Sequence, residues 1–433
     1  MKMKKIYFLM AAFVCLTLSC GDGMNLPPVG VETDLNKIPL PSDNTDDLMK
    51  IPLKAETEPM NHCGALHTPE DFQRIKENEN VDPWKSGLQL LRNSWHAQLN
   101  YSPNPQVDIR RGVSGDENYM IAAKDVASAY QMGLRYHLGD GDAYADKAIE
   151  IMNGWATTCT LVTGNTNLAL AAGLYGYEFA VAGELIRDYW IAKDEVEFKR
   201  YQKWMVDIFY TGNHDFLINH FGTPPLHYWA NWSLCNLASM LAIGILADRR
   251  DIYNEAIEHL QIGETSGRMT NAIYHVFDGE YANFAQWQES GRDAGHTFLC
   301  QGLMGTICQL TWNQGDDFFG YNDNMFLKAC EYNGRYHVAG LNVPYVEYIR
   351  EYKGNWGIDY EPHPAIADRG DGAGPIWAVA YYHYTKVKGV EAEKCQYTKM
   401  GTDKSFPEGG GGNYGGNSGG YDQLGFGTLM YAR

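Results

Sequence analysis

The residues best equipped for chemistry lie in one short motif, Gln286–Thr297. Within it, Glu289, Arg292 and His296 follow one another at spacings of three and four residues. On a helix these spacings put a carboxylate, a guanidinium and an imidazole on one face. Such a face can bind an anionic group and move a proton, because Arg is a forked donor and His titrates near neutrality. The same spacing equally fits a salt-bridge triplet that pins neighbouring helices.

A second group of residues, Thr223–Trp232, combines two prolines with four ring-bearing side chains at the expected start of a helix. Aromatic rings cover the apolar face of a sugar ring, so this segment fits the rim of a sugar-binding site. Asn231 stands where the helix should begin. It is therefore either a site residue or an N-cap, because Asn is a preferred capping residue.

Both groups must be positioned by helices, since apolar residues recur at intervals of three to four along most of the chain. Thr68 followed by Pro69, Glu70 and Asp71 is typical of a capped helix start. Further helices are predicted over Tyr119–Leu138, Tyr144–Trp155, Leu168–Trp190, Asp194–Phe209, Trp232–Ala247 and Tyr253–Leu260. Breaks are predicted at Gly139–Gly141, Gly164–Thr166, Gly212–Asn213, Gly222–Pro225 and Gly263–Gly267.

Paired helices with short connections predict a mainly α fold, an α/α toroid in which helical hairpins form an incomplete barrel. Later in the chain, Tyr345–Tyr352 and Ile376–Tyr384 can still be helices. Pro407–Tyr421 is Gly-rich but lacks the strand-to-helix setting of a phosphate-binding loop, so it is either a surface loop or a substrate-covering one. We expect the toroid to span residues 60–400 and the Gly-rich segment 401–433 to pack on it.

The N-terminus is typical of an exported lipoprotein. Residues 1–19 form a signal peptide with a basic start and an apolar stretch that is too short for a bilayer core of about 30 Å. Ser19-Cys20 resembles a bacterial lipobox, so Cys20 is predicted to be lipidated; the alternative is a plain signal peptide with an incidental cysteine. Residues 20–59 have the composition of a flexible tether. The protein would then be anchored to the cell envelope, at the outer membrane or its periplasmic face, and would meet the membrane only through this anchor.

Composition excludes some partners. The net charge of −18 argues against a nucleic-acid-binding surface, although a local cluster of cations in a groove can still bind an acidic polymer. No C-x-x-C pair occurs and no His, Asp or Glu spacing resembles a metal cage, so no metal is expected. The seven cysteines beyond Cys15 and Cys20 are expected to be mostly buried apolar side chains.

Longer runs of the sequence resemble the alginate-lyase domain family of helical-toroid polysaccharide lyases, most of all polysaccharide lyase family 38. The runs that carry this resemblance are HTPEDFQRIKE, AYADKAIEIMNGWA, AAGLYGYEFAVAGELIRD, YWANWSLCNLASMLAIGILADRRDIYNEAI, QESGRDAGHT, WNQGDDFFGYNDNMFLKACEYNGRY and PIWAVAYYHYTKVKG. They cover roughly residues 62–390, and the likeness extends to the Gly-rich ending. The resemblance implies an α/α toroid that acts on alginate or a related polyuronate without a cofactor. Several toroid alginate lyases have a His directly after the site Asn, where this chain has Trp232.

The resemblance also implies a site and a mechanism. Asn231, Arg292 and His296 match the residues that neutralise the substrate carboxylate, which allows β-elimination to remove the proton on C5 of a uronate. A tyrosine or histidine would act as base and acid, the candidates being Tyr228, Tyr177 and His227. Glu289 would orient Arg292 or His296. Predicted sugar contacts are Gln286, Gln288 and Asn313 for hydroxyls, and Trp229, Trp232 and Trp287 for stacking.

Two other functions fit the same sequence. A glycoside hydrolase acting on uronides would need two opposed carboxylates, Glu289 or Asp293 with Asp125 or Glu178. A surface glycan-binding lipoprotein without activity would also be helical, exported and rich in aromatic residues.

Overall fold

The computed structural model describes residues 49–62 and 65–433. The expected signal peptide, Cys20, residues 21–48 of the expected tether and Cys63 lie outside these residues. The described helices are α1 (Pro69–Asn78), α2 (Trp84–Asn93), α3 (Tyr119–Arg135), α4 (Asp142–Thr158), α5 (Leu168–Leu185), α6 (Arg187–Met205), α7 (Thr211–Asn219), α8 (Ala230–Leu246), α9 (Arg250–Ile262), α10 (Met269–Ala272), α11 (Ala294–Asn313), α12 (Tyr321–Asn333), α13 (Ala378–Tyr382), α14 (Gln396–Lys404) and α15 (Gly427–Tyr431). None of them combines the length and apolar character needed to span a membrane.

Within the described residues, six short strands form three two-stranded sheets. The strands are β1 (Asp108–Arg111), β2 (Leu161–Gly164), β3 (Ile273–Val276), β4 (Ala285–Trp287), β5 (Tyr348–Lys353) and β6 (Ile358–His363). β1 and β2 pair in parallel, whereas β3–β4 and β5–β6 are antiparallel.

The predicted helix start at Thr68 is confirmed. The Thr68 hydroxyl accepts a hydrogen bond from the Asp71 backbone N–H at 3.4 Å, and the Asp71 carboxylate accepts the Thr68 N–H at 3.0 Å. This reciprocal arrangement is a capping box, and Pro69 occupies the first helical position.

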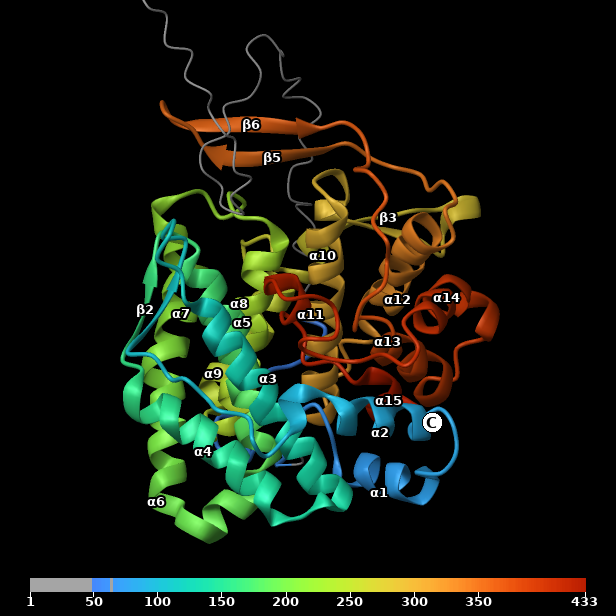
Figure 1. Cartoon of the computed structure of the whole chain (residues 1–433). Coiled ribbons are helices and arrows are strands. Elements are labelled where there is room, and N and C mark those ends of the chain that lie inside the picture. Colours follow the sequence, from blue (N-terminus) through green and yellow to red (C-terminus); the bar gives the residue numbers. More distant parts are fainter. Residues whose placement is uncertain (1–48, 63–64) are drawn as a thin grey trace, which may run out of the picture. The chain divides into compact units, whose positions relative to one another are not determined.

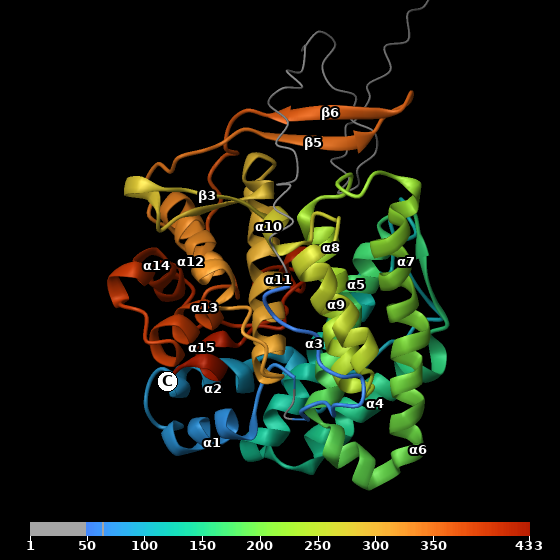
Figure 2. The same cartoon turned by 180° about the vertical axis from the view of Figure 1, so that it is seen from behind.

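The long helices α3, α5, α8 and α11 form the inner layer. Each packs against the next, with α4 against α3 and α9 against α8. These four helices lie near the centre of both views in Figure 1 and Figure 2, with α6 and α7 on one flank and α12 and α14 on the other. α5 and α8 are buried over nearly their whole length, as expected for helices that are apolar on every side.

α5 and α8 run in the same direction and touch closely. A Cβ on Gly173 would lie 2.4 Å from the Cys235 sulfur, and a Cβ on Gly176 would lie 2.2 Å from the Ser239 hydroxyl. The contacts advance along both helices in the same direction, and Gly183 approaches Leu246 further on, which shows that the two helices are parallel. Their N-terminal ends, and the polar residues found there, therefore lie at the same end of the inner layer.

Two local predictions are wrong. Gly212–Asn213, expected as a break, lies inside α7, because packing outweighs the modest helix penalty of a single glycine. Tyr345–Tyr352, expected as a helix, contributes β5, whose Tyr348 pairs with His363 of β6. Tyr348, Arg350 and Tyr352 alternate with other residues at period two, which is a strand pattern.

The chain around the helical layers is also fixed at both ends of the described region. Arg250 of α9 donates to the carbonyls of Glu58 and Pro59, and Gln261 bonds the backbone of Ile51. The last part of the expected tether, residues 51–59, is thus bound to α9, because polar side chains of that helix hold its backbone.

In the Gly-rich segment, the carbonyl of Gly411 accepts a hydrogen bond from the Gln131 side chain of α3. The six described cysteines are buried and unpaired.

Candidate active site

Asn231 lies in the first turn of α8 and is almost wholly buried, with 1% of its surface exposed. Its side-chain nitrogen donates to Glu289 Oε1 at 2.7 Å, and its backbone N–H donates to the same oxygen at 2.8 Å. The preceding N–H, on Ala230, donates to Gln288 Oε1 at 2.8 Å. Trp229 occupies the N-cap position without a side-chain cap. The interpretation of Asn231 as an N-cap is therefore wrong, and Gln288 and Glu289 satisfy this helix end instead.

Glu289 also holds Arg292. Its second oxygen, Oε2, accepts from Arg292 Nη1 at 2.9 Å. Burial disfavours the charged form of this carboxyl, but the Arg292 charge and the Asn231 hydrogen bonds outweigh that effect and lower the pKa of Glu289. The Arg292 guanidinium lies over the Trp229 ring, 5.1 Å from its centre. One buried carboxylate therefore fixes both Asn231 and Arg292, as predicted for the Glu289–Arg292 pair.

Asp293 orients His296. It is the N-cap of α11, where its Oδ1 accepts the His296 N–H at 2.8 Å, while its Oδ2 bonds His296 Nδ1 at 2.6 Å. Burial opposes the charged form of Asp293, but the bonds from His296 and the charge of Arg292 lower its pKa to about 2. An ionised carboxylate only accepts, so Nδ1 carries the proton in this pair and Nε2 points away from Asp293.

Asn231, Arg292 and His296 thus lie together, but a helix face does not join them. α11 begins only at Ala294, and Glu289 belongs to a short 3₁₀ turn, Gln288–Gly291, that precedes it. The links are the two carboxylates: Glu289 bonds Asn231 and Arg292, while Asp293 bonds His296 and lies 3.8 Å from Arg292 Nε. The side chains of Arg292 and His296 are 19% and 25% exposed, so solvent reaches both.

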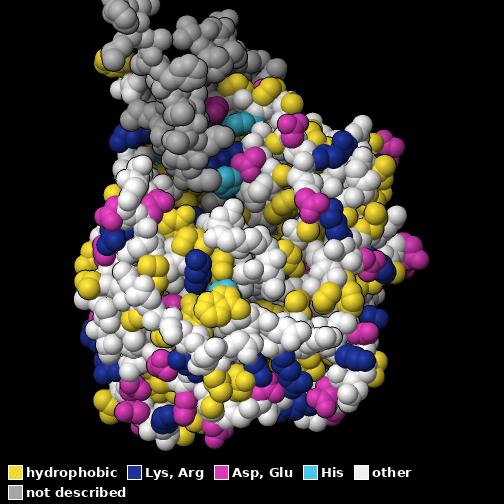
Figure 3. Space-filling view, in the orientation of Figure 1, with side chains coloured by type: hydrophobic (Ala, Val, Ile, Leu, Met, Phe, Trp, Pro, Cys, Tyr) yellow, Lys and Arg dark blue, Asp and Glu magenta, His cyan; other side chains and the backbone are white. Residues whose placement is uncertain are grey.

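The β5–β6 hairpin contributes residues that the sequence did not single out. Arg350 of β5 lies over the Trp229 ring at 4.9 Å and donates to the His227 carbonyl from two nitrogens, at 2.8 and 2.6 Å. The Tyr348 hydroxyl accepts from Gln288 Nε2 at 2.6 Å. Histidine, basic and acidic side chains gather near the top of the face shown in Figure 3, and charges of both signs are interspersed below. Only the period-two pattern of β5 could have indicated these residues.

The predicted proton-transfer residues have other contacts. Tyr228 packs in an aromatic cluster with Phe216 and Trp232. The Tyr177 hydroxyl donates to the Asp422 carbonyl at 2.7 Å, and burial raises its pKa well above the ordinary value. His227 Nδ1 accepts the Lys353 backbone N–H at 2.8 Å.

Several side chains predicted as sugar contacts bond other parts of the protein. Gln286 is fully buried and bonds the backbone of Val346 through both amide atoms. Trp287 is fully buried and donates to the Ala329 carbonyl. Asn313 lies at the far end of α11, roughly 25 Å from His296 at a rise of about 1.5 Å per residue.

The remaining three predicted contacts are also enclosed. Trp232 lies in the Tyr228 cluster, Gln288 is engaged at the start of α8, and Trp229 is 2% exposed. The guanidinium groups of Arg292 and Arg350 lie against the Trp229 ring. The ring is therefore occupied and unsuited to stacking on a sugar.

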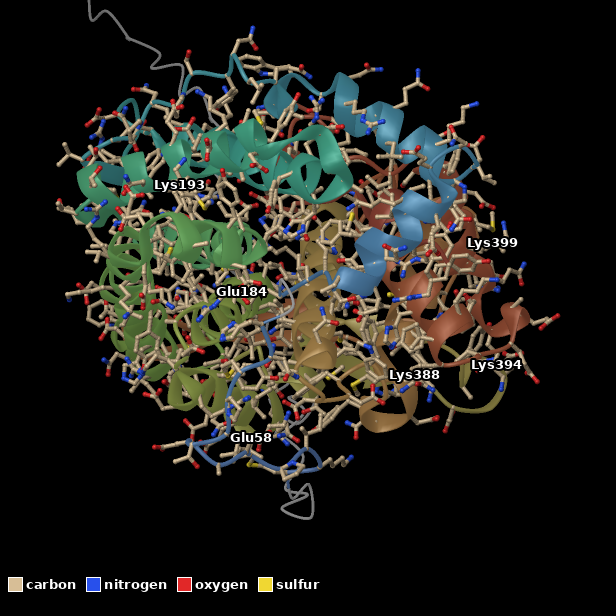
Figure 4. All side chains as sticks on the ribbon, turned by 90° about the horizontal axis from the view of Figure 1, so that it is seen from below. Glu58, Glu184, Lys193, Lys388, Lys394 and Lys399 are labelled. Carbon is tan, nitrogen blue, oxygen red and sulfur yellow. The ribbon has the colours of Figure 1, made fainter. Side chains whose placement is uncertain are left out.

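Two described cavities lie away from this cluster. One, of about 320 Å³, is at the C-terminal end of α5 and is lined by His62, Glu184 and Arg187 among others. Figure 4 shows the molecule from this side, with Glu184 labelled. The other lies along the N-terminal arm beside Lys54 and Asp316. Neither is lined by Asn231, Arg292 or His296, and no group of three or more metal-binding side chains gathers within residues 49–62 and 65–433.

Comparisons with known proteins bear on the whole helical region. A family model described as alginate lyase matches residues 73–340. An alginate lyase structure from Bacteroides ovatus has a TM-score of 0.52 at 14% identity, covering 78% of this chain and 95% of that one. The apo form of a histidine-to-alanine variant of alginate lyase A1-III, an enzyme of Sphingomonas species A1, has a TM-score of 0.53 at 14% identity, covering 86% and 96%. No curated protein matches the sequence. Because the family model spans more than half of the chain and the likeness in structure extends over the same helices, this protein belongs to the alginate lyase family.

Proposed function

We propose that this protein cleaves a polyuronate, such as alginate, polymannuronate or glucuronan, by β-elimination. Family membership supports a polysaccharide lyase. The observation that carries the finer proposal is the joining of Asn231, Arg292 and His296 through the carboxylates of Glu289 and Asp293. These contacts bring a guanidinium, an amide and an imidazole to the N-terminal ends of α8 and α11.

The first task of such a site is to neutralise the uronate carboxylate. The proton on C5 is weakly acidic while that carboxylate is fully charged, so donors that strengthen as the dianion forms lower the barrier. Arg292 supplies a planar, permanently charged donor, and the Trp229 ring and Glu289 fix its orientation. The positive ends of the α8 and α11 dipoles add to this field.

The second task is proton transfer, which we assign to His296 rather than to Tyr228, Tyr177 or His227, the candidates from the sequence. Its Nδ1–H is held by Asp293, which leaves Nε2 to accept the C5 proton. The electrons of the C5–H bond then form the C4–C5 double bond as the C4–O4 bond breaks. O4 leaves on the departing chain and takes up one proton, from His296 or from a tyrosine such as Tyr228.

The hydrolase alternative finds less support. Asp125 accepts hydrogen bonds from the Tyr101 hydroxyl, the Asn104 N–H and the Trp155 indole, which leaves it serving the interior between α3 and α4. Glu178 is buried, and burial together with the nearby charge of Asp422 raises its pKa well above the ordinary value. Both side chains are almost wholly buried, whereas the two carboxyls of a hydrolytic pair must flank a bound substrate.

The decisive experiment is a panel of polymannuronate, mixed alginate and glucuronan assayed by near-ultraviolet absorbance with product sizing. Elimination leaves a C4–C5 double bond that absorbs, whereas hydrolysis does not. Rising absorbance with shortening chains is the expected result. Shortening without absorbance would favour hydrolysis, and retardation in an affinity gel without any product would favour a glycan-binding protein.

We also propose that the protein works at the cell envelope, anchored through lipidated Cys20. The support is the sequence of residues 1–20 alone, which lie outside the described structure. A Cys20→Ser variant should move from the membrane fraction to the soluble fraction. Its retention at membranes would contradict lipid anchoring at this residue.

A further inference from the structure

The cavity of about 320 Å³ lies at the C-terminal end of α5, whereas the candidate active site lies at the N-terminal ends of α8 and α11. It is bordered by α1, by the turn that follows α3 and by the junction between α5 and α6, at the end of the molecule seen in Figure 4. Small-molecule sites typically measure roughly 300–1,000 Å³. The cavity therefore has room for a small ligand, and no residue that we assign to β-elimination lines it.

Beside the cavity, four charged side chains neutralise one another. His62 Nδ1 bonds Glu184 Oε1 at 2.9 Å, and its Nε2 bonds Asp248 Oδ1 at 2.5 Å. Arg187 donates to the second oxygen of each carboxylate, at 3.4 and 2.5 Å. Burial opposes the charged form of His62, but the bonds to Asp248 and Glu184 outweigh it and raise its pKa to about 9. Two cations thus face two carboxylates, and this cluster has no excess charge to attract an anion.

Three further polar groups border the cavity without a hydrogen bond or ion pair in the part of the chain that the structure describes. They are the Lys76 ammonium on α1, the Tyr136 hydroxyl and the Asp188 carboxylate in the first turn of α6. Burial lowers the pKa of His137, which Lys76 lowers further and Asp188 raises, so both charges act on this one ring. A cationic donor, an anionic acceptor and a hydroxyl are therefore available in the same small space.

Two tyrosine rings supply an aromatic wall. The ring centres of Tyr136 and Tyr189 are 5.1 Å apart and their planes are inclined by 58°, so the rings form a corner. The Tyr189 hydroxyl donates to Asp146 at 2.8 Å, which leaves its ring as the part available to a ligand. Aromatic faces cover the apolar face of a sugar ring. A sugar hydroxyl both donates and accepts hydrogen bonds, so Lys76 and Asp188 can bond hydroxyls of one sugar.

We propose that this cavity binds a neutral mono- or disaccharide, with Lys76 and Asp188 on its hydroxyls and the Tyr136–Tyr189 corner on its apolar face. The charges around the cavity balance, since the His62 cluster is neutral and Lys76 is matched by Asp188. The cavity thus differs from the Arg292 cluster, whose cation suits a carboxylate. The inference is independent of the proposed function and gives the protein a second, non-catalytic carbohydrate site.

Isothermal titration calorimetry of the purified protein with glucose, galactose, mannose, maltose and cellobiose tests this site. At least one of these sugars should bind with a Kd on the order of 1 mM. Lys76→Ala and Asp188→Ala each remove a charge-assisted hydrogen bond, so each should weaken that binding about tenfold. Both residues are exposed, and the substitutions should leave the fold intact.

The matched controls are Lys85→Ala and Asp142→Ala, which should bind the sugar as the wild type does. Lys85 is an exposed lysine on the neighbouring helix α2. Asp142 lies in the first turn of α4, as Asp188 does in α6, and acts electrostatically on Tyr136, but it does not line the cavity. Equal weakening in Asp142→Ala and Asp188→Ala would overturn the proposal, since a general change in surface charge would then explain the effect.

The other outcomes of the titration are equally decisive. Failure of all five sugars to bind, or equal binding by Lys76→Ala, Asp188→Ala and the wild type, would overturn the site. Glutamine and a saturated diuronate complete the panel. Binding of either one in place of the sugars would overturn the neutral saccharide, because the cavity would then recognise charges. Turnover of a polyuronate by Asp188→Ala should equal that of the wild type, and a lowered kcat would overturn the assignment of the cavity as non-catalytic.

Discussion

At the residue scale, the account depends on which side chains Glu289 and Asp293 hold by hydrogen bonds. Glu289 is fully buried and accepts hydrogen bonds from Asn231 and Arg292. Asp293 is partly exposed and bonds the imidazole of His296. The anions orient the groups that would meet the substrate and are themselves held ionised by those groups. Carboxylates that close to C5 would oppose the developing negative charge if they were not paired in this way.

Arg292→Ala should lower turnover about 10²-fold or more, because a donor aimed at the developing dianion is lost. The same change leaves Glu289 buried without its cation, which costs about 3–5 kcal/mol of stability. Arg292→Lys should restore most of the stability but little of the turnover, since an ammonium lacks the planar fork. Measuring kcat and Tm for both variants separates the two effects. Near-normal turnover in a folded Arg292→Ala protein would remove Arg292 from the site.

Two sequence segments, Thr223–Trp232 and Gln286–Thr297, were sufficient to nominate Asn231, Arg292 and His296, since resemblance and residue chemistry agreed on them. They could not show that Asp293 is the link to His296, because a residue that caps a helix and one that orients an imidazole look alike in sequence. The burial of Gln286 and Trp287 could not be predicted for a related reason. Their partners, Val346 and Ala329, are distant in the chain, and only the fold shows that these side chains are enclosed.

At the element scale, the close approach of α5 and α8 positions the site. Small residues on α5 let the backbone of α8 come near, and the parallel direction brings the first turn of α8 beside the start of α5. Helical periodicity predicted both helices, since each is long and apolar. Helical periodicity could not predict the β5–β6 hairpin, whose six-residue strands carry only a short period-two pattern, and which bonds the rest of the protein through Arg350 and Tyr348.

Gly173→Ala should destabilise the protein by about 1–3 kcal/mol, because the new Cβ would lie 2.8 Å from the Asn236 backbone nitrogen and 2.4 Å from the Cys235 sulfur. The matched control is Gly212→Ala in α7, where the nearest atom, Ala172 Cβ, is 3.6 Å away. That change should be neutral or stabilise by about 0.5 kcal/mol through helix propensity. Urea unfolding measures both, and equal midpoints for the two variants would argue against tight α5–α8 packing.

At the scale of the whole molecule, the predicted mainly α toroid is confirmed by the helical architecture and by its likeness to known alginate lyases. The two ends of the described chain are fastened to it. Arg74 of α1 donates to the carbonyls of Met430 and Ala432, and the backbone of residues 58–59 is held by Arg250. Composition indicated a tether up to residue 59 because its Pro and Asp content resembles a flexible segment, and composition does not register such long-range bonds.

Buried carboxyls should make stability depend on pH. Glu408 is buried, accepts the Trp377 and Ala378 N–H groups, and has its pKa raised by burial from 4.5 to about 7. Its contribution to stability is complete below pH 4.5 and is lost as pH rises through about 7, by about 3 kcal/mol at about 1.4 kcal/mol per pKa unit. Glu408→Gln keeps the acceptor and cannot ionise. Urea unfolding at pH 5 and pH 8 should show a smaller stability loss in the variant, and an identical loss would contradict the assignment.

The most direct test of the account is mass spectrometry of the oligomers that the wild-type protein releases from a defined polyuronate. Elimination breaks the C4–O4 bond without adding water, so each new non-reducing end should be unsaturated and one water lighter than its saturated counterpart. That result is predicted, with product formation suppressed in the Arg292→Ala variant. Oligomers that have gained one water at every cut would contradict β-elimination at the Asn231, Arg292 and His296 cluster.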